Sequence, residues 1–188
     1  PGADFFASLE SIRKKLGATP IPVQIPLGQE ENFEGMIDLV SMRAVVYETD
    51  TLGADFEIQE VPEHYLKTAT EWRDTMLEVV VESNDILLEK YLAGEEIETT
   101  ELMAAIRKGT CELEFTPCLC GSAFKNKGVQ TMLDAVIEYL PAPDEVKAIK
   151  GFLDDGETEA ERSADDDQPF AALAFKIATD PFVGALPF

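Results

Sequence analysis

The chain has 188 residues, 45% of them hydrophobic and 28% charged, which indicates one or two globular domains with enough apolar mass to bury a core. The 37 acidic residues outnumber the 15 basic ones, so the formal net charge is -22. This charge disfavours binding to bare nucleic acid or to an anionic membrane, because both require a cationic surface. No apolar run in the sequence is long enough to span a bilayer.

The histidine and cysteine content restricts the catalytic and metal-binding sites that the chain can build. A two-histidine zinc site is excluded because His64 is the only histidine, and it lies in a polar segment without a nucleophile motif. Cys111, Cys118 and Cys120 form an odd and sparse set, so we expect reduced, buried thiols rather than a disulfide framework. We expect the thiols of Cys118 and Cys120 to point to opposite faces, and we expect no metal site.

Hydrophobic spacing predicts a helix at the start of the chain, followed by extended segments. The helix covers residues 5–16, with Asp4 as its cap and Gly17 at its end. Its apolar face is formed by Phe5, Leu9, Ile12 and Leu16. Residues 20–26 alternate in polarity but contain three prolines, which favour a sheet edge or an irregular strand. A small antiparallel sheet is predicted from the short runs 33–39, 44–47 and 56–61.

Helical periodicity dominates the middle of the chain. Helices are predicted from residue 63 to about 80, from 86 to a stop at Gly94, from 102 to a stop at Gly109, and over 128–139. The predicted buried face of the last helix consists of Val129, Met132, Leu133, Val136 and Leu140. An extended segment over 113–120 precedes that helix, and the strand–loop–helix order predicts an α/β layer.

The last 45 or so residues differ from the rest in composition. Residues 144–168 are rich in acidic side chains and poor in core formers, which indicates a solvated linker or an exposed hairpin. A new strand is predicted from Phe170, with Asp180-Pro181 as a turn.

The segment 120–130 is the most specific stretch of the sequence. It contains Gly121, Ser122 and Ala123 between an apolar strand and a helix, and such small residues let backbone N–H groups approach a flat ligand. On these residues alone, an ordinary βα loop and a polar-ligand site both remain open. The phosphate-binding patterns G-x-x-x-x-G-K-[ST] and G-x-G-x-x-G do not occur.

This segment, continued through 133–136 and 139–143, resembles translation elongation factor G. Further stretches that resemble that family are 16–18, 26–28, 31–35, 37–39, 90–92, 107–110 and 174–184. The resemblance extends over essentially the whole chain, in order. Ribosome-protection and release factors share parts of this plan, and the run 175–184 favours the translocation factor over them.

The resemblance implies an α/β fold that is part of a P-loop GTPase G domain, with an inserted α+β subdomain and a truncated β-barrel. The implied parts are the helix after the guanine motif (1–20), the inserted subdomain (21–113), the return of the G domain (114–143), an acidic linker (144–168) and the start of domain II (169–188). We therefore expect a piece of a longer protein.

The implied parent protein is a GTPase that moves tRNA and mRNA through the ribosome, helps ribosome recycling, and uses GTP or GDP with Mg²⁺. In the family, the alanine of this loop donates its backbone N–H to the guanine carbonyl oxygen, a role that falls to Ala123 beside Ser122 and Phe124. Phe124 stands where small GTPases usually carry lysine. The phosphate loop, switch regions, Mg²⁺ ligands and Asn-Lys-x-Asp motif are missing from the sequence. We therefore expect this chain alone to hold no catalytic residue and neither to bind nor to hydrolyse GTP.

Acidic residues at helical spacing form a second candidate site. Glu71, Asp74, Glu78 and Glu82 share one helix face, which Asp85 and Glu89 continue if the break at 83–84 is mild. A solvated face and a docking stripe for a basic partner are both compatible with this pattern. In the family, the inserted subdomain contacts the C-terminal domain of the ribosomal stalk protein.

The remaining expectations concern partners and location. We expect a monomer that binds the ribosome through protein contacts, without direct nucleic-acid or membrane binding. Its expected location is the bacterial cytoplasm, with an organellar matrix or stroma as the alternative. A free-standing acidic interaction module is the main rival interpretation, and a carboxylate-dependent hydrolase has only the abundance of acids in its favour.

Overall fold

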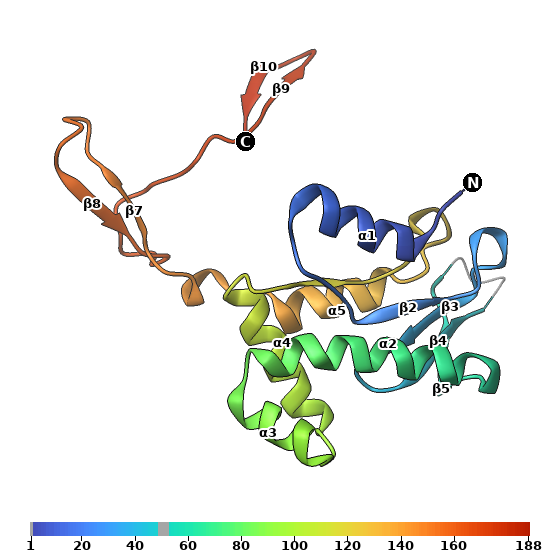
Figure 1. Ribbon diagram of the computed structural model, residues 1–188. Coiled ribbons are helices and arrows are strands. Elements are labelled where there is room, and N and C mark those ends of the chain that lie inside the picture. Colours follow the sequence, from blue (N-terminus) through green and yellow to red (C-terminus); the bar gives the residue numbers. More distant parts are fainter. Residues whose placement is uncertain (1, 49–52) are drawn as a thin grey trace. The chain divides into compact units, whose positions relative to one another are not determined.

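Helices and short strands alternate through the first of two units in the computed structural model, which describes residues 2–48 and 53–188. The two units are Pro1–Leu140 and Pro141–Phe188. In the first unit, the helices are α1 (Phe5–Leu16), α2 (Glu63–Glu82), α3 (Asp85–Ala93), α4 (Thr99–Cys111) and α5 (Val129–Tyr139). Its strands are β1 (Pro20–Pro22), β2 (Gln24–Leu27), β3 (Gly35–Asp38), β4 (Arg43–Tyr47), β5 (Phe56–Glu60) and β6 (Thr116–Cys118). The expected mixture of helices and small sheets is confirmed (Figure 1).

Helix α1 has the predicted limits because both of its ends are capped by side-chain or backbone geometry. The Asp4 carboxylate accepts the N–H of Ala7, and Gly17 ends the helix in the left-handed conformation with φ 64°. The four predicted apolar residues share one face of this helix, but their burial ends before its last turn: Leu9 is buried, whereas Leu16 is exposed. The described residues provide no cover for the last helical turn.

The prolines of segment 20–26 divide it between two sheets. Strand β1 pairs in parallel with β6, in the register Ile21 opposite Pro117. Strand β2 forms the edge of an antiparallel sheet with the order β2-β3-β4-β5, which confirms the predicted small sheet. Edge and irregular strands tolerate proline because few of their N–H groups are needed for pairing.

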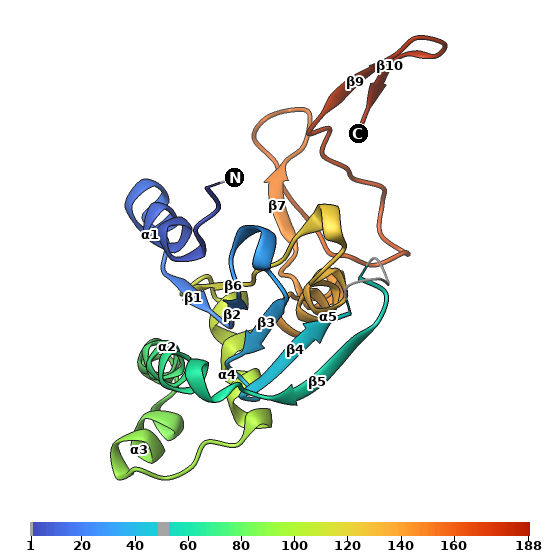
Figure 2. The same cartoon turned by 90° about the vertical axis from the view of Figure 1, so that its right-hand side faces the viewer.

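The core of the first unit lies between the two sheets and helices α2 and α4. Helix α2 packs against β1 and α4 against β6 (Figure 2), and the buried side chains Ile21, Met76 and Ile106 belong to one hydrophobic cluster. Arg73 of α2 donates hydrogen bonds to the carbonyl oxygens of Leu39 and Val40 in the β3–β4 turn. These bonds fix the helix against the end of the sheet.

Helix α4 runs past its predicted end, because Gly109 lies inside the helix rather than after it. A Cβ atom at Gly109 would stand 2.3 Å from the Phe115 ring, so the glycine provides room for that buried ring. The added turn ends at Cys111, whose side chain is exposed. The expectation of buried thiols is therefore wrong for Cys111, and Cys118 and Cys120 are half-buried.

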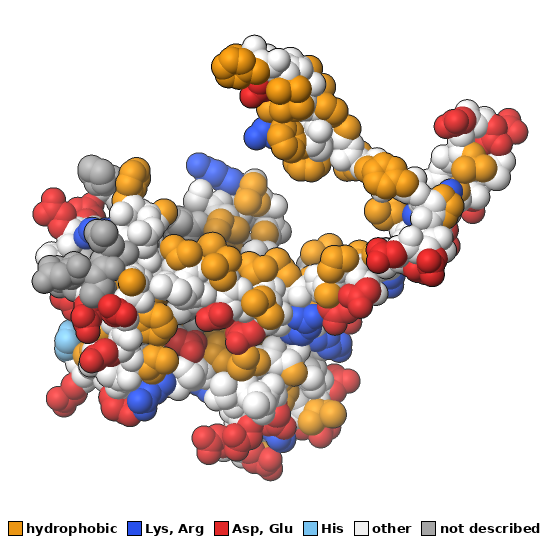
Figure 3. All heavy atoms as spheres, turned by 180° about the vertical axis from the view of Figure 1, so that it is seen from behind, with side chains coloured by type: hydrophobic (Ala, Val, Ile, Leu, Met, Phe, Trp, Pro, Cys, Tyr) orange, Lys and Arg blue, Asp and Glu red, His pale blue; other side chains and the backbone are white. Residues whose placement is uncertain are grey.

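Helix α5 has the predicted length but buries a different face. The five side chains predicted to be buried, Val129, Met132, Leu133, Val136 and Leu140, are 36% to 53% exposed. Ala135 and Tyr139 are buried instead. Among the described residues no layer covers the apolar face of α5, and the first unit carries hydrophobic side chains at its surface (Figure 3). Apolar periodicity reports what a helix can bury, not whether a covering layer is present.

The second unit consists of two antiparallel hairpins. The first pairs β7 (Ile149–Phe152) with β8 (Glu159–Arg162), which confirms the exposed-hairpin alternative for this acidic segment. The second pairs β9 (Ile177–Asp180) with β10 (Gly184–Pro187) around a turn in which Asp180 accepts the N–H groups of Phe182 and Val183.

The strand predicted from Phe170 begins only at Ile177. Phe175 and Lys176 form backbone hydrogen bonds with Phe188, which extend the second hairpin. Residues 170–174 find no partner strand within the part of the chain that the structure describes, and a strand needs hydrogen-bonding neighbours. Across these same described residues, no helix combines the length and the apolarity that crossing a membrane requires.

Candidate functional site

The loop of residues 122–127, which follows β6, closes on itself through backbone hydrogen bonds. Ser122 and Lys127 exchange both backbone bonds, at N···O distances of 2.9 and 3.1 Å. Between them, Ala123–Lys125 form a short 3-10 turn, and Asn126 reverses the chain with φ 51°. The small residues of this segment thus form a tight, defined loop rather than an extended connection.

This loop leaves its first backbone donors free. The N–H groups of Lys125 and Asn126 are bonded inside the loop, to the carbonyl oxygens of Ser122 and Ala123. The N–H groups of Ala123 and Phe124 have no hydrogen-bond partner among the described residues. Ala123 is exposed, and the Phe124 side chain is fully exposed. The loop can therefore donate a backbone hydrogen bond to a polar edge of a ligand.

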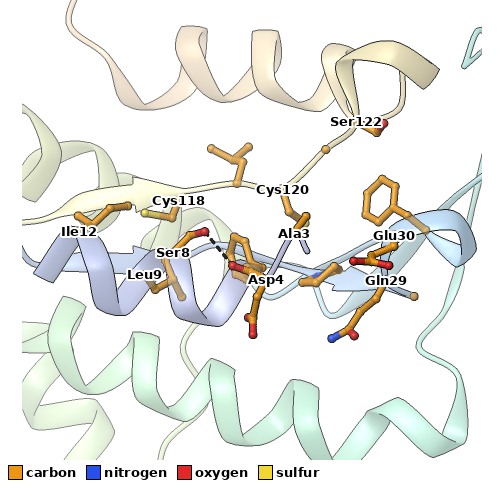
Figure 4. Close-up of a pocket in the computed structure, with 16 residues that line it drawn as sticks. Ala3, Asp4, Ser8, Leu9, Ile12, Gln29, Glu30, Cys118, Cys120 and Ser122 are labelled. Carbon is orange, nitrogen blue, oxygen red and sulfur yellow. Dashed lines mark hydrogen bonds between the residues drawn. The ribbon is translucent and has the colours of Figure 1, made fainter. Parts of the chain in front are cut away.

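A cavity of about 480 Å³ lies beside the loop, between the first turns of α1 and the turn at residues 28–33 (Figure 4). Of the three predicted contact residues only Ser122 lines this cavity, whereas Ala123 and Phe124 lie outside it. Its walls are mainly apolar, and they include Leu9 and Ile12 from α1. The cavity is suited to a flat, largely apolar group rather than to a highly charged one.

Both neighbouring thiols line this same cavity, so the expectation that Cys118 and Cys120 point to opposite faces is wrong. Side chains alternate along an extended chain, and residues two positions apart therefore share a face. Burial raises the pKa of the Cys118 thiol and raises that of Cys120 to about 12. Both thiols are thus neutral at pH 7 and poor nucleophiles.

The described residues contain no group of three or more His, Cys, Asp or Glu side chains placed to hold a metal ion. Asp4 and Glu30 are the carboxylates of the cavity wall, and both already accept backbone N–H groups, from Ala7 and Gly2. The cavity can therefore hold a ligand by hydrogen bonds and by its shape, but its two carboxylates do not form an acid–base pair.

Two lysines tie the loop to a distant part of the chain. The ammonium group of Lys127 donates to the carbonyl oxygen of Phe33 at 3.1 Å, and that of Lys125 donates to the carbonyl oxygen of Glu31 at 3.2 Å. Each contact spans 94 positions in the sequence. Sequence reasoning missed these residues, because nothing in a local pattern indicates which distant carbonyl a lysine will meet.

The four acidic residues of the second candidate site are all exposed on α2. The Oε1 atom of Glu71 lies 3.8 Å from the Nζ atom of Lys67, one helical turn earlier. The buried side chains of α2, such as Met76 and Val80, lie on the opposite face of the helix. The predicted stripe of Glu71, Asp74, Glu78 and Glu82 is thus a continuous, solvent-facing surface.

The stripe does not continue along one helix beyond Glu82. Asn84 accepts the N–H groups of Ile86 and Leu87 and so begins α3 as a separate helix (Figure 1). Asp85 and Glu89 are exposed, but they lie on this second helix, so they do not extend the stripe along the face of α2.

Comparisons with known proteins give a structural relative but no family. No family model matches the chain. A crystal structure of a protein from Thermus thermophilus is similar over 99% of this chain, with a TM-score of 0.68 and 27% sequence identity. The chain spans only 25% of the length of that protein.

Proposed function

We propose that this chain is part of a translational GTPase of the elongation factor G type, in which Ser122, Ala123 and Phe124 form the guanine-contact loop. The proposed parent protein drives GTP-dependent movement of tRNA and mRNA on the ribosome. The observation that carries the proposal is the closed 122–127 loop with the free N–H group of Ala123. That donor is the group that the family resemblance assigns to the guanine carbonyl oxygen.

Two further observations support the proposal. The loop follows a parallel strand, and ligands of α/β sheets bind outside the carboxyl ends of such strands. The similar protein from Thermus thermophilus is about four times as long as the matched segment, which agrees with a chain that supplies one part of a larger protein. GTP would supply the reactive phosphates, and this chain would contribute only contacts to the base.

We further propose that the acidic stripe of α2 binds a basic surface on the C-terminal domain of a ribosomal stalk protein. The four exposed carboxylates give a one-sided negative surface, and complementary charge speeds and orients association.

A calorimetric titration with that domain should show binding that weakens as salt rises, because salt screens exposed charges. Glu78→Lys combined with Glu82→Lys should weaken it further, and the absence of heat in the unaltered chain would leave the stripe as solvated surface.

The guanine-contact assignment is tested in the full-length protein with Ala123→Pro, which removes the N–H donor. Proline suits this position, because Ala123 opens a helical turn and Ser122 before it is extended, with φ -130° and ψ 101°. We expect GDP affinity to fall by about tenfold or more, because the guanine carbonyl oxygen loses its partner. Ala123→Ser keeps the N–H and serves as the control. Failure of the unaltered full-length protein to bind GDP would overturn the proposed function.

A further inference from the structure

The 122–127 loop is held from outside by the turn that joins β2 to β3. Lys127 is central to this arrangement, because its backbone pairs with Ser122 while its ammonium group bonds to the carbonyl oxygen of Phe33. Its side chain is partly buried, and Phe33 is itself a core residue. One residue thus connects the start of the loop to the turn between β2 and β3.

A second contact to the loop comes from Gly53. Gly53, between β4 and β5, packs directly on the loop, and a Cβ atom there would stand 2.5 Å from the carbonyl oxygen of Asn126. Gln130, just after the loop, donates its amide N–H to the carbonyl oxygen of Gly53 at 2.9 Å. Two positions outside the strands therefore contact the loop: Phe33, through Lys127, and Gly53.

The β2–β3 turn has its own support in helix α2. The N–H of Gly28 donates to the Tyr65 hydroxyl at 3.1 Å, and the N–H of Glu34 donates to the carbonyl oxygen of Leu27 at 2.9 Å. The turn is therefore held both by α2 and by its own backbone pairing, and Lys127 bonds to this supported turn.

We propose that Lys127 is a positioning residue that holds the 122–127 loop in the orientation from which the Ala123 N–H reaches a guanine carbonyl oxygen. The inference rests on the proposed function. It names the residue that would make the loop favour a base with a carbonyl oxygen, such as guanine. A loop that is already in its binding conformation loses no affinity to reorganisation, whereas a loop that is only partly in that conformation does.

The experiment compares the unaltered full-length protein with Lys127→Met, which keeps the aliphatic stem but removes the ammonium group. Two ligands are titrated: GDP, and 2-aminopurine riboside diphosphate, which lacks the carbonyl oxygen. We expect Lys127→Met to lower GDP affinity by about threefold to tenfold and to leave affinity for the analogue unchanged. The preference for GDP should therefore fall by the same factor. Lys108→Met, on the exposed side of α4, is the matched control and should keep the full preference.

The outcomes separate the two proposals. If the unaltered protein does not prefer GDP to the analogue, the guanine-contact assignment itself is wrong. If it does prefer GDP and Lys127→Met keeps that preference, or lowers both affinities equally, the positioning role is wrong. Lys127→Gln, whose shorter side chain falls short of Phe33, is a second variant that should lower the preference in the same way if the methionine variant does not fold.

Discussion

Gly109 shows how a single missing side chain decides local packing. It lies in the last turns of α4, where the ring of Phe115 occupies the space that a Cβ atom would take. We predict that Gly109→Ala lowers the free energy of unfolding by about 1–3 kcal/mol, since overpacking outweighs the gain in helix propensity. Chemical denaturation followed by Trp72 fluorescence would measure the change.

The control for this substitution is the same change in a Phe115→Leu background. The smaller leucine leaves room, so Gly109→Ala should cost less there than in the unaltered chain. Equal costs in both backgrounds would mean that the Phe115 ring is not the obstacle.

At the scale of elements, α3 and α4 are joined by an ion pair between Lys90 and Glu101, at 2.6 Å. The hydrogen bond from Lys90 lowers the pKa of Glu101, and the same bond raises the pKa of Lys90. A lowered carboxyl pKa stabilises the folded state above the ordinary value of about 4.3, and this contribution is lost as the pH falls through the folded-state pKa. The lysine contribution is present below about pH 10.4 and is lost as the pH rises through its raised pKa.

We therefore predict how Glu101→Gln changes the pH dependence of unfolding. The stability difference between the unaltered chain and this variant should be constant between about pH 6 and 9 and should shrink below about pH 4.3. Urea denaturation across this range is the measurement. A difference that persists undiminished into strong acid would show that the carboxylate charge is not its source.

For the whole molecule, the uncovered apolar face of α5 matters most, because its contribution to stability depends on whether another layer covers it. In the 188-residue chain we predict that Leu133→Gln with Val136→Gln changes the free energy of unfolding by less than about 0.5 kcal/mol per substitution, because both side chains are half exposed. The buried position Ala135, changed to Gln, should by contrast destabilise the chain strongly. Denaturation of the three proteins in parallel tests this.

The full-length protein provides the complementary result. If a further layer covers α5 there, as the proposed G domain implies, the same double substitution should cost about 1–3 kcal/mol per position. An equally small effect in both proteins would mean that the α5 face stays exposed to solvent in the longer one.

Elements that depend on neighbours along the chain could be predicted from the amino-acid sequence. The limits of α1 follow from Asp4 and Gly17, and the split between α2 and α3 follows from the cap at Asn84, because capping acts within one turn of helix. The exposed acidic face of α2 was likewise predictable, since helical spacing alone sets which residues share a face.

Features that depend on distant partners could not be predicted in this way and became visible only in the folded chain. The apolar stripe of α5 indicated burial, but burial requires a covering layer, and none is present among the described residues. The bond from Lys127 to Phe33 joins positions 94 residues apart, so no local pattern could predict it. Contacts of this kind arise when separate elements pack, and they hold the candidate loop in its place.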